Sequence, residues 1–173
     1  MGRINNPNFS KFFCGLLFPA TYNINEIYKL LESKFKDDID IKSDVIDFDF
    51  TTYYNPEMGA NLKRQWISFK TLLNPDRLAD IKVMTNDIED GLAIDKKRII
   101  NIDPGYLTCA NVILASTKDF SHRIYLSKGI YAEVTTIYKK EGFVKLPWTY
   151  PDYICPTAVN FILRARQCLL KHG

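Results

Sequence analysis

The chain has 173 residues, of which 46% are hydrophobic and 25% charged, and its formal net charge is +3. This is ordinary globular composition, which excludes extended disorder, and the length predicts a single domain over residues 1–173. The net charge is too small to indicate a nucleic-acid partner, and no apolar run approaches the roughly 20 residues that cross a bilayer. Four scattered cysteines without a C-x-x-C pair favour reduced thiols and therefore a cytoplasmic protein.

The first predicted elements are a strand and a helix. Residues 1–10 are polar and predict a flexible arm, whereas the continuous apolar run over 11–18 predicts a strand that is buried on both faces. A helix over 25–35 follows, because apolar side chains recur there at helical spacing and Asn23 or Asn25 can cap its first turn.

The segment 45–54 alternates strictly between apolar and polar residues, which is typical of a half-buried strand. Its expected core side chains are Ile46, Phe48 and Phe50. Asp47 and Asp49 lie on the opposite face, which we expect to be exposed. Residues 63–72 predict a second strand, which can pair antiparallel with the first across a loop over 55–61.

A second helix and a third long strand follow. The turn at Asn74-Pro75-Asp76 predicts a helix over 76–90, and a strand over 98–102 should end at Asp103-Pro104-Gly105. The order is then β-α-β-β-α-β, which indicates an α+β protein with a ferredoxin-like core and a mostly antiparallel sheet. We expect the helices 25–35 and 76–90 on one face of this sheet and the other face open.

The remaining residues predict an extension of the core. Residues 107–117 are helix-like, and Lys128-Gly129 predicts the tight turn of a β-hairpin. The other expected elements are strands over 122–127, 130–139 and 143–146, an irregular aromatic segment over 147–156 and a closing helix from 157.

Missing motifs exclude several catalytic classes. The chain has no G-x-x-x-x-G-K-[ST] phosphate loop, no G-x-G-x-x-G after a strand, no G-x-S-x-G and no H-E-x-x-H. Its two histidines, His122 and His172, do not form the His-x-Thr or His-x-Ser pairs of a two-histidine phosphoesterase. The sequence identifies no cofactor, and it leaves open whether the protein is an enzyme.

Three dense segments carry a resemblance to a known family. They contain F-D-F-T-T-Y-Y-N-P-E-M-G over 48–59, N-I-D-P-G-Y-L-T over 101–108, and S-T-K-D-F-S-H-R-I-Y-L over 116–126, the last continuing to L-P-W-T-Y-P-D-Y over 146–153. Together they resemble the prokaryotic family known only as domain of unknown function 4416, over roughly residues 11–154. The resemblance implies a small soluble bacterial or archaeal protein, and it implies no activity, cofactor or catalytic residue.

Three carboxylates are candidate metal ligands. Asp47 and Asp49 point to the same side of their predicted strand, where Arg64 on the next strand can lie opposite them. This pattern fits a paired-carboxylate or metal site, and equally an exposed strand with cross-strand ion pairs. Asp103 stands at a predicted strand end, where it can hold a cation such as Mg²⁺ or a substrate hydroxyl, or cap the turn.

The segment around the hairpin combines cations with a histidine. Lys118 and Arg123 can form an anion clamp, because arginine suits bidentate contacts to phosphate or carboxylate. Arg123 can instead form a plain salt bridge with Glu133, which the hairpin register places on the same face. His122 is the residue whose type suits proton transfer near neutral pH, so His122, Asp103 and Glu133 are candidate catalytic residues.

We expect Arg64, Lys118, Arg123, Tyr53 and Trp148 to bind a ligand in one cleft with these candidate catalytic residues. The aromatic segment containing Trp148, Tyr150 and Tyr153 can supply a wall for a planar ligand, or its rings can plug the sheet. The leading hypothesis is a small-molecule-binding protein, with or without catalysis, for an anionic nucleotide-like or phosphorylated ligand. The alternatives are an interaction or assembly module, including a homo-oligomer, that uses the open sheet face, and thirdly RNA binding.

Overall fold

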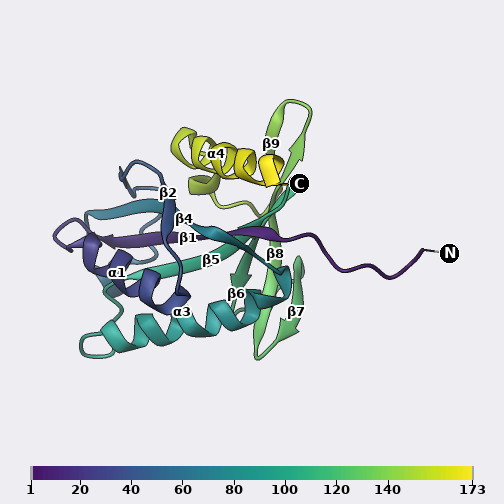
Figure 1. The fold of residues 1–173 in the computed structure, drawn as a ribbon. Coiled ribbons are helices and arrows are strands. Elements are labelled where there is room, and N and C mark those ends of the chain that lie inside the picture. Colours follow the sequence, from purple (N-terminus) through teal and green to yellow (C-terminus); the bar gives the residue numbers. More distant parts are fainter. Residues whose placement is uncertain (1, 173) are drawn as a thin grey trace.

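The computed structural model describes residues 2–172, which form an open antiparallel sheet of nine strands with helices on both faces (Figure 1). The strands are β1 (Ser10–Pro19), β2 (Ile39–Lys42), β3 (Ile46–Asp47), β4 (Leu62–Leu73), β5 (Asn101–Leu107), β6 (Asn111–Ser116), β7 (Arg123–Ser127), β8 (Ile130–Lys139) and β9 (Gly142–Lys145). The helices are α1 (Ile24–Phe35), α2 (Asn55–Met58), α3 (Leu78–Leu92) and α4 (Pro156–His172), with short 3₁₀ turns η1 (Pro75–Arg77) and η2 (Pro151–Ile154).

The strand order across the sheet is β2-β4-β1-β5-β6-β8-β7, with β3 beside β4 and β9 beside β8. Figure 1 shows that β6, β7 and β8 run steeply across the direction of β1 and β5, so the sheet bends between β5 and β8. The sheet is therefore larger than the expected four-stranded core with a hairpin, and its two parts run in different directions.

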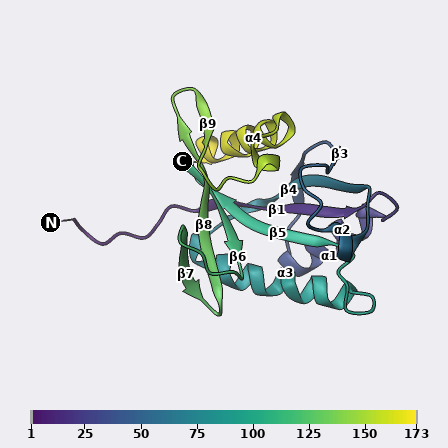
Figure 2. The ribbon, with the colours of Figure 1, turned by 180° about the vertical axis from the view of Figure 1, so that it is seen from behind.

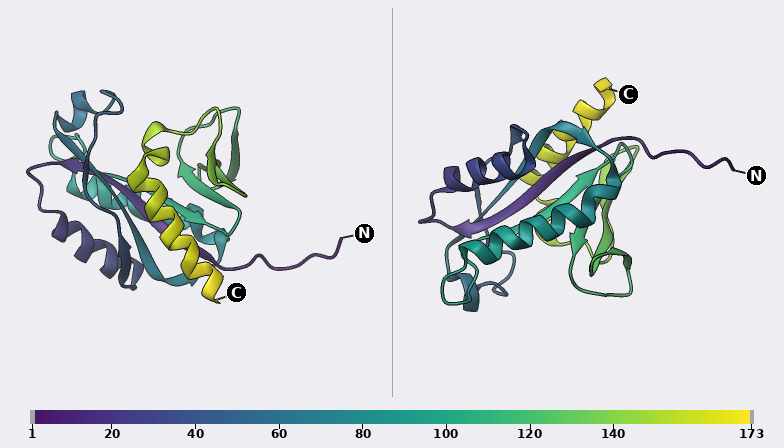
Figure 3. Two further views of the ribbon diagram at one scale, coloured as in Figure 1. Left: turned by 90° about the horizontal axis from the view of Figure 1, so that it is seen from above. Right: turned by 60° about the horizontal axis from the view of Figure 1, so that its bottom comes forward.

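Helices cover both faces of the sheet. From behind, α4 lies on one side of β1 and β5 and α3 on the other, and the tilted views show α4 alone over one face and α1 with α3 over the opposite one (Figures 2 and 3). The expectation that α1 and α3 share a face is confirmed, whereas the expectation of an open second face is wrong. Helix α4 covers that face because its apolar side chains, including Phe161 and Ile162, pack there against Phe13 and Trp66.

Successive side chains of strand β1 point to opposite faces of the sheet and enter different hydrophobic cores. Phe13 packs under α4, whereas its neighbours Phe12 and Cys14 face the side of the sheet that carries α3 and α1. All three side chains are buried, which confirms the prediction of a strand buried on both faces. Its continuous apolar run therefore results from helices packed on both sides, as in other doubly covered sheets.

Elements with local sequence signals form where they were expected. Helix α1 begins after Asn23, whose side chain accepts a hydrogen bond from the Asn25 backbone N–H, as the capping pattern predicted. The β7–β8 hairpin turns at Lys128 and Gly129, which both have positive φ (56° and 75°), as a two-residue hairpin turn requires. Helices α3 and α4 also begin within about two residues of the expected positions.

The helix expected over 107–117 is wrong, because strand β6 lies there. Val112 and Leu114 contribute to the core under α4, while Ile113 and Ala115 contribute to the core under α3. A short apolar run that is buried on both sides has no polar face, so its periodicity does not distinguish a helix from a central strand.

Strand β5 lies three residues later than expected, and Asp103-Pro104-Gly105 is inside it rather than at its end. Pro104 is tolerated because β6 pairs with β5 only from Gly105 onward, so the strand has a single partner at Pro104. Gly105 is required because a Cβ there would lie 2.4 Å from the carbonyl oxygen of Ile113 on β6.

The strand expected over 45–54 shortens to β3, and the sequence analysis missed β2 just before it. The predicted parity is nevertheless correct, since Asp47 and Asp49 are exposed and the apolar side chains between and beside them are partly buried. The strand ends early because the Phe48 ring packs against Phe50 and Tyr54, with centroids 5.6 and 5.9 Å away, so the chain leaves the sheet. Among the described residues no helix is long and apolar enough to cross a membrane.

Candidate functional site

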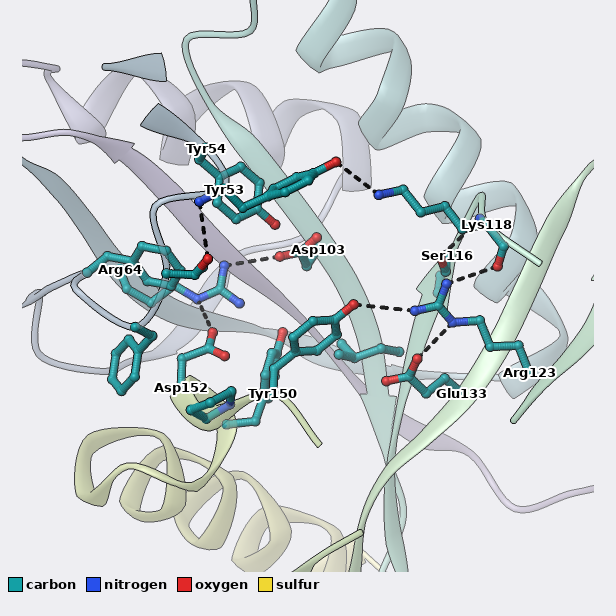
Figure 4. Close-up of a pocket in the computed structure, with 17 residues that line it drawn as sticks. Tyr53, Tyr54, Arg64, Asp103, Ser116, Lys118, Arg123, Glu133, Tyr150 and Asp152 are labelled. Carbon is teal, nitrogen blue, oxygen red and sulfur yellow. Dashed lines mark hydrogen bonds and ion pairs between the residues drawn. The ribbon is translucent and has the colours of Figure 1, made fainter. Parts of the chain in front are cut away.

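A cavity of about 370 Å³ lies on the face that carries α4, where the bend of the sheet leaves room between β4 and β8 (Figure 4). Strands β4 to β8 form its floor, and the loop over 48–54 and η2 form its walls. Its aromatic lining is Phe48, Phe50, Tyr53, Tyr54, Tyr150 and Tyr153. Its charged lining is Arg64, Asp103, Lys118, Arg123, Glu133 and Asp152.

Strand register explains why side chains that are distant in sequence share this floor. Gly105 on β5 lies opposite Leu114 on β6, Leu114 opposite Glu133 on β8, and Glu133 opposite Arg123 on β7. Directly paired residues point to the same face of a sheet, so Glu133 and Arg123 extend the row that Gly105 begins. The expected pairing of Arg123 with Glu133 is confirmed.

Arg64 reaches the floor of the cavity across a glycine. It starts on β4, passes over Gly15 on β1 and contacts Asp103 on β5, with 3.1 Å from Nη1 to Oδ2. A Cβ on Gly15 would lie 2.8 Å from both Arg64 Nη2 and the Tyr153 hydroxyl, so the glycine makes this crossing possible. Asp152 contacts the same guanidinium from η2, with 2.9 Å from Nε to Oδ2.

The two carboxylates on Arg64 have different acidities. Burial opposes ionisation of Asp103, but the positive charges of Arg64 and Lys82 outweigh it and lower the pKa of Asp103. The side chain of Asp103 lies in the middle of the sheet, but 28% of its surface remains accessible. Burial, reinforced by the charge of Asp103, raises the pKa of Asp152 in spite of Arg64. This end of the cavity therefore holds two carboxylates and one guanidinium.

Glu133 forms the centre of a second charged cluster. Its Oε2 accepts hydrogen bonds from Arg123 Nε at 2.8 Å and contacts His122 Nε2 at 3.1 Å. The side chain is only 2% exposed, and its other oxygen, Oε1, has no hydrogen-bond partner among the described residues. The salt bridge between Arg123 and Glu133 is therefore formed, and it leaves one buried carboxylate oxygen available.

Two tyrosines lie at the mouth of the cavity, each held by a cation. Lys118 Nζ donates to the hydroxyl of Tyr53 at 3.1 Å, and Arg123 Nη2 donates to the hydroxyl of Tyr150 at 3.4 Å. The two rings remain 63% and 51% exposed, so a ligand that covered them would bury apolar surface. Figure 4 shows them on opposite sides of the opening, with the two cations beside them.

Two predicted site residues lie behind the wall rather than in the cavity. The His122 ring stacks on Trp148, with centroids 4.8 Å apart, and Trp148 Nε1 donates to the backbone carbonyl of Val134 at 2.7 Å. His122 reaches the cavity only through Glu133, and Trp148 does not line it. Both are placed to hold Glu133 and β8 in position.

The structure does not bring the candidate metal ligands Asp47, Asp49 and Asp103 together. Asp47 pairs with Lys63 on β4 and is exposed, and Ile46 rather than an aspartate lies opposite Arg64, so the expected register is wrong by one residue. Asp49 is exposed on the loop, while Asp103 lies in the cavity. Among the side chains that the structure describes, no group of three or more histidine, cysteine or acidic residues could hold a metal ion.

The sequence analysis missed Asp152 as the second partner of Arg64, and it missed Tyr54 in the lining. The sequence signal at Asp152 was an acidic residue within the aromatic segment over 147–156. An aspartate in such a segment is as often a turn or helix cap as a partner of a distant cation. Tyr54 had no signal of its own, because its burial beside Arg64 and Asp103 arises from the loop that leaves β3.

Comparisons with known proteins identify a family without an assigned activity. The family model described as Domain of unknown function (DUF4416) matches residues 8–168. No curated protein and no solved structure matches the chain.

Proposed function

The chain belongs to the family described as Domain of unknown function (DUF4416), and from its cavity we propose that it is a small-molecule-binding protein whose ligand carries an anionic group and a planar ring. The observation that carries the proposal is the charge pattern of the wall. Arg64 and Arg123 are each paired with carboxylates, whereas Lys118 forms no ion pair with any residue that the structure describes.

This pattern makes the cavity dipolar. The end at Arg64 holds two carboxylates against one cation, Arg123 and Glu133 balance each other, and Lys118 adds an uncompensated positive charge at the mouth. An anionic ligand group is therefore favoured at Lys118, with a further contact to Arg123, and disfavoured near Asp103 and Asp152. A phosphate or carboxylate satisfies this requirement.

The rings at the mouth support a planar ligand part. Tyr53 and Tyr150 are already oriented by their hydroxyl contacts, so the rotamer entropy lost on binding is reduced. Aromatic side chains stack on planar ligands and contribute about 1–3 kcal/mol for a stacked base. A volume of about 370 Å³ lies within the usual range of small-molecule sites.

We also infer that the elements from β1 to β5 form a ferredoxin-like core. Supporting this inference, β2, β4, β1 and β5 are adjacent in that order, and every neighbouring pair is antiparallel. Helices α1 and α3 pack on the same face of these strands, as in a β-α-β-β-α-β unit.

The proposal is tested by isothermal titration calorimetry with nucleoside 5′-monophosphates and their unphosphorylated nucleosides. We expect a monophosphate to bind and its nucleoside to bind more weakly, because only the first offers an anion to Lys118. Lys118→Met should weaken binding about tenfold or more, which is the usual contribution of one charge-assisted hydrogen bond. The matched control Lys145→Met removes an exposed lysine of β9 outside the cavity and should leave the affinity unchanged.

Two results would contradict the proposal. One is that no monophosphate binds the wild-type protein at millimolar concentration. The other is that Lys118→Met and Lys145→Met bind the same monophosphate equally well, since the charge of Lys118 would then have no part in recognition.

Assembly with a second copy is the other candidate function, and one observation favours it. Strand β7 lies at the edge of the sheet and exposes Ile124, Tyr125 and Leu126. Edge strands with apolar side chains are prone to pair with another strand. Sedimentation velocity should then show a dimer that Ile124→Lys dissociates; a wild-type protein that stays monomeric at all concentrations excludes this candidate.

A further inference from the structure

We infer that the ligand of this cavity donates a hydrogen bond from a nitrogen atom to Oε1 of Glu133, so that its ring carries an amino group on the edge that faces β8. The inference rests on the proposed function and narrows it, because it selects amino-substituted anionic rings among all anionic planar ligands.

The first observation is the state of Glu133 itself. The side chain is 2% exposed and lines the cavity, its Oε2 is occupied by Arg123 and His122, and its Oε1 is buried without a partner among the described residues. Buried polar atoms in folded proteins are nearly always paired, so an unpaired carboxylate oxygen facing a cavity indicates a donor that arrives with the ligand. Figure 4 shows the Glu133 carboxylate beside Arg123 in the cavity wall, with one oxygen joined to Arg123 and the other without a drawn contact.

The second observation is that no donor among the described residues lies within hydrogen-bond distance of Oε1, although several donors are nearby. Arg123 uses all three guanidinium nitrogens, since Nε donates to Glu133, Nη1 to the carbonyl of Lys118 and Nη2 to the hydroxyl of Tyr150. Lys118 Nζ is held at Tyr53. Across β6 the residue opposite Glu133 is Leu114, which has no donor in its side chain. Each of these donors is therefore directed at another acceptor, and a side chain would have to move to satisfy Oε1.

The position of Glu133 also links the donor to the anion. Arg123 bridges Glu133 and the Lys118 backbone, so the free carboxylate oxygen and the uncompensated lysine belong to one hydrogen-bonded wall. A ligand with its anionic group at Lys118 therefore presents another part of its ring system to Glu133. A carbonyl or ring nitrogen acceptor at that point would meet a carboxylate lone pair and be rejected, whereas an amino group would be accepted.

The test compares three nucleotides of nearly identical shape by calorimetry. Purine riboside 5′-monophosphate has no N–H on its base, adenosine 5′-monophosphate adds an amino group at C6, and 2-aminopurine riboside 5′-monophosphate adds it at C2. We expect at least one amino-substituted nucleotide to bind the wild-type protein about tenfold or more tightly than purine riboside 5′-monophosphate, since a lost donor leaves a buried acceptor unpaired. This comparison needs no variant, so it stands even where a substitution impairs folding.

A variant then assigns the preference to Glu133. Glu133→Gln can keep an oxygen on Arg123 and turn its amide nitrogen toward the cavity, which replaces an acceptor with a donor; we expect the amino preference to disappear or reverse. Glu141→Gln, an exposed glutamate between β8 and β9, should keep the preference. Circular dichroism of each variant establishes that it is folded.

The outcomes separate this inference from the function on which it rests. If all three nucleotides bind equally and Lys118→Met weakens all three, the ligand class proposed above stands and the amino requirement is wrong. If Glu133→Gln still binds the amino-substituted nucleotides more tightly than purine riboside 5′-monophosphate, the inference is also wrong, because another residue then recognises the amino group. If none of the three binds, both the proposed function and the inference fall.

Discussion

At the scale of single residues, Gly15 controls the geometry of the cavity although it contributes no side chain. The Arg64 guanidinium and the Tyr153 hydroxyl occupy the space above it, and Arg64 crosses this space to reach Asp103. A glycine in the middle of a buried strand weakens that strand, so its presence on β1 is consistent with close approach by another group.

Gly15→Ala should therefore destabilise the protein by about 1–3 kcal/mol, the usual range for an added methyl group in a filled interior. Urea unfolding at neutral pH measures this change. The matched control is Gly91→Ala, because a Cβ added at Gly91 in α3 would meet no described atom within 4 Å outside the adjoining helix backbone. It should stabilise the helix by about 0.5–1 kcal/mol. A wild-type stability for Gly15→Ala would show that Arg64 can be rearranged without loss.

The two aspartates on Arg64 should respond differently to replacement by asparagine. The fold lowers the pKa of Asp103 below its ordinary 3.8, so the ionised form of Asp103 stabilises the folded state. The fold raises the pKa of Asp152 above 3.8, so ionised Asp152 opposes folding. At pH 7 we expect Asp103→Asn to lose about 2 kcal/mol, and Asp152→Asn to lose less because Asp103 still neutralises Arg64.

The pH dependence gives an independent check. The stability that Asp103 contributes is fully present above pH 3.8 and is lost as the pH falls through its lower folded-state pKa. The stability difference between the wild type and Asp103→Asn, measured between pH 7 and pH 2.5, should therefore shrink as the pH falls below 3.8. A constant difference over this range would mean that Asp103 acts through packing rather than charge.

At the scale of elements, α4 and the loop over 48–54 are held against the sheet to different degrees, and only the loop lines the cavity. Phe161 of α4 is fully buried, and its ring lies 6.1 Å from that of Phe13 on β1. Phe48 of the loop is only partly buried and belongs to a small cluster with Met58 and Leu62. The loop is therefore a deformable wall of the cavity, whereas α4 is fixed against the sheet.

Alanine substitutions should show this difference. Phe161→Ala should cost about 3–5 kcal/mol, the range for removing a fully buried phenylalanine, and Phe48→Ala about 1–2 kcal/mol because solvent already reaches its ring. Urea midpoints with unchanged slopes measure both values. Equal losses at the two positions would indicate that the loop is packed as firmly as the helix.

At the scale of the whole molecule, the bend of the sheet creates the site. Arg64 and Asp103 come from the part of the sheet around β1, whereas Arg123 and Glu133 come from the β7–β8 hairpin, and Figure 1 shows the second part turned across the first. The loop over 48–54 and η2 close the remaining sides. Strand pairing through β6 is the connection that brings the two charged clusters to one cavity.

The sequence by itself determined the elements whose signals are local. Asn23 caps α1 and the Lys128-Gly129 turn sets the β7–β8 register, because capping and positive-φ turns depend on a few adjacent residues. That register already placed Arg123 opposite Glu133. The excess of polar residues around Arg64, Asp103 and Lys118 likewise marked them as candidates before their positions were known.

The tertiary structure alone decided the rest. Residues 107–117 become β6 because two cores cover them, and Pro104 lies inside β5 because β6 pairs only beyond it. Asp152 meets Arg64 only after η2 folds back over the sheet, and Oε1 of Glu133 is left without a partner among the described residues while Oε2 binds Arg123. These features depend on packing and strand pairing between distant segments, which no local pattern of residues encodes.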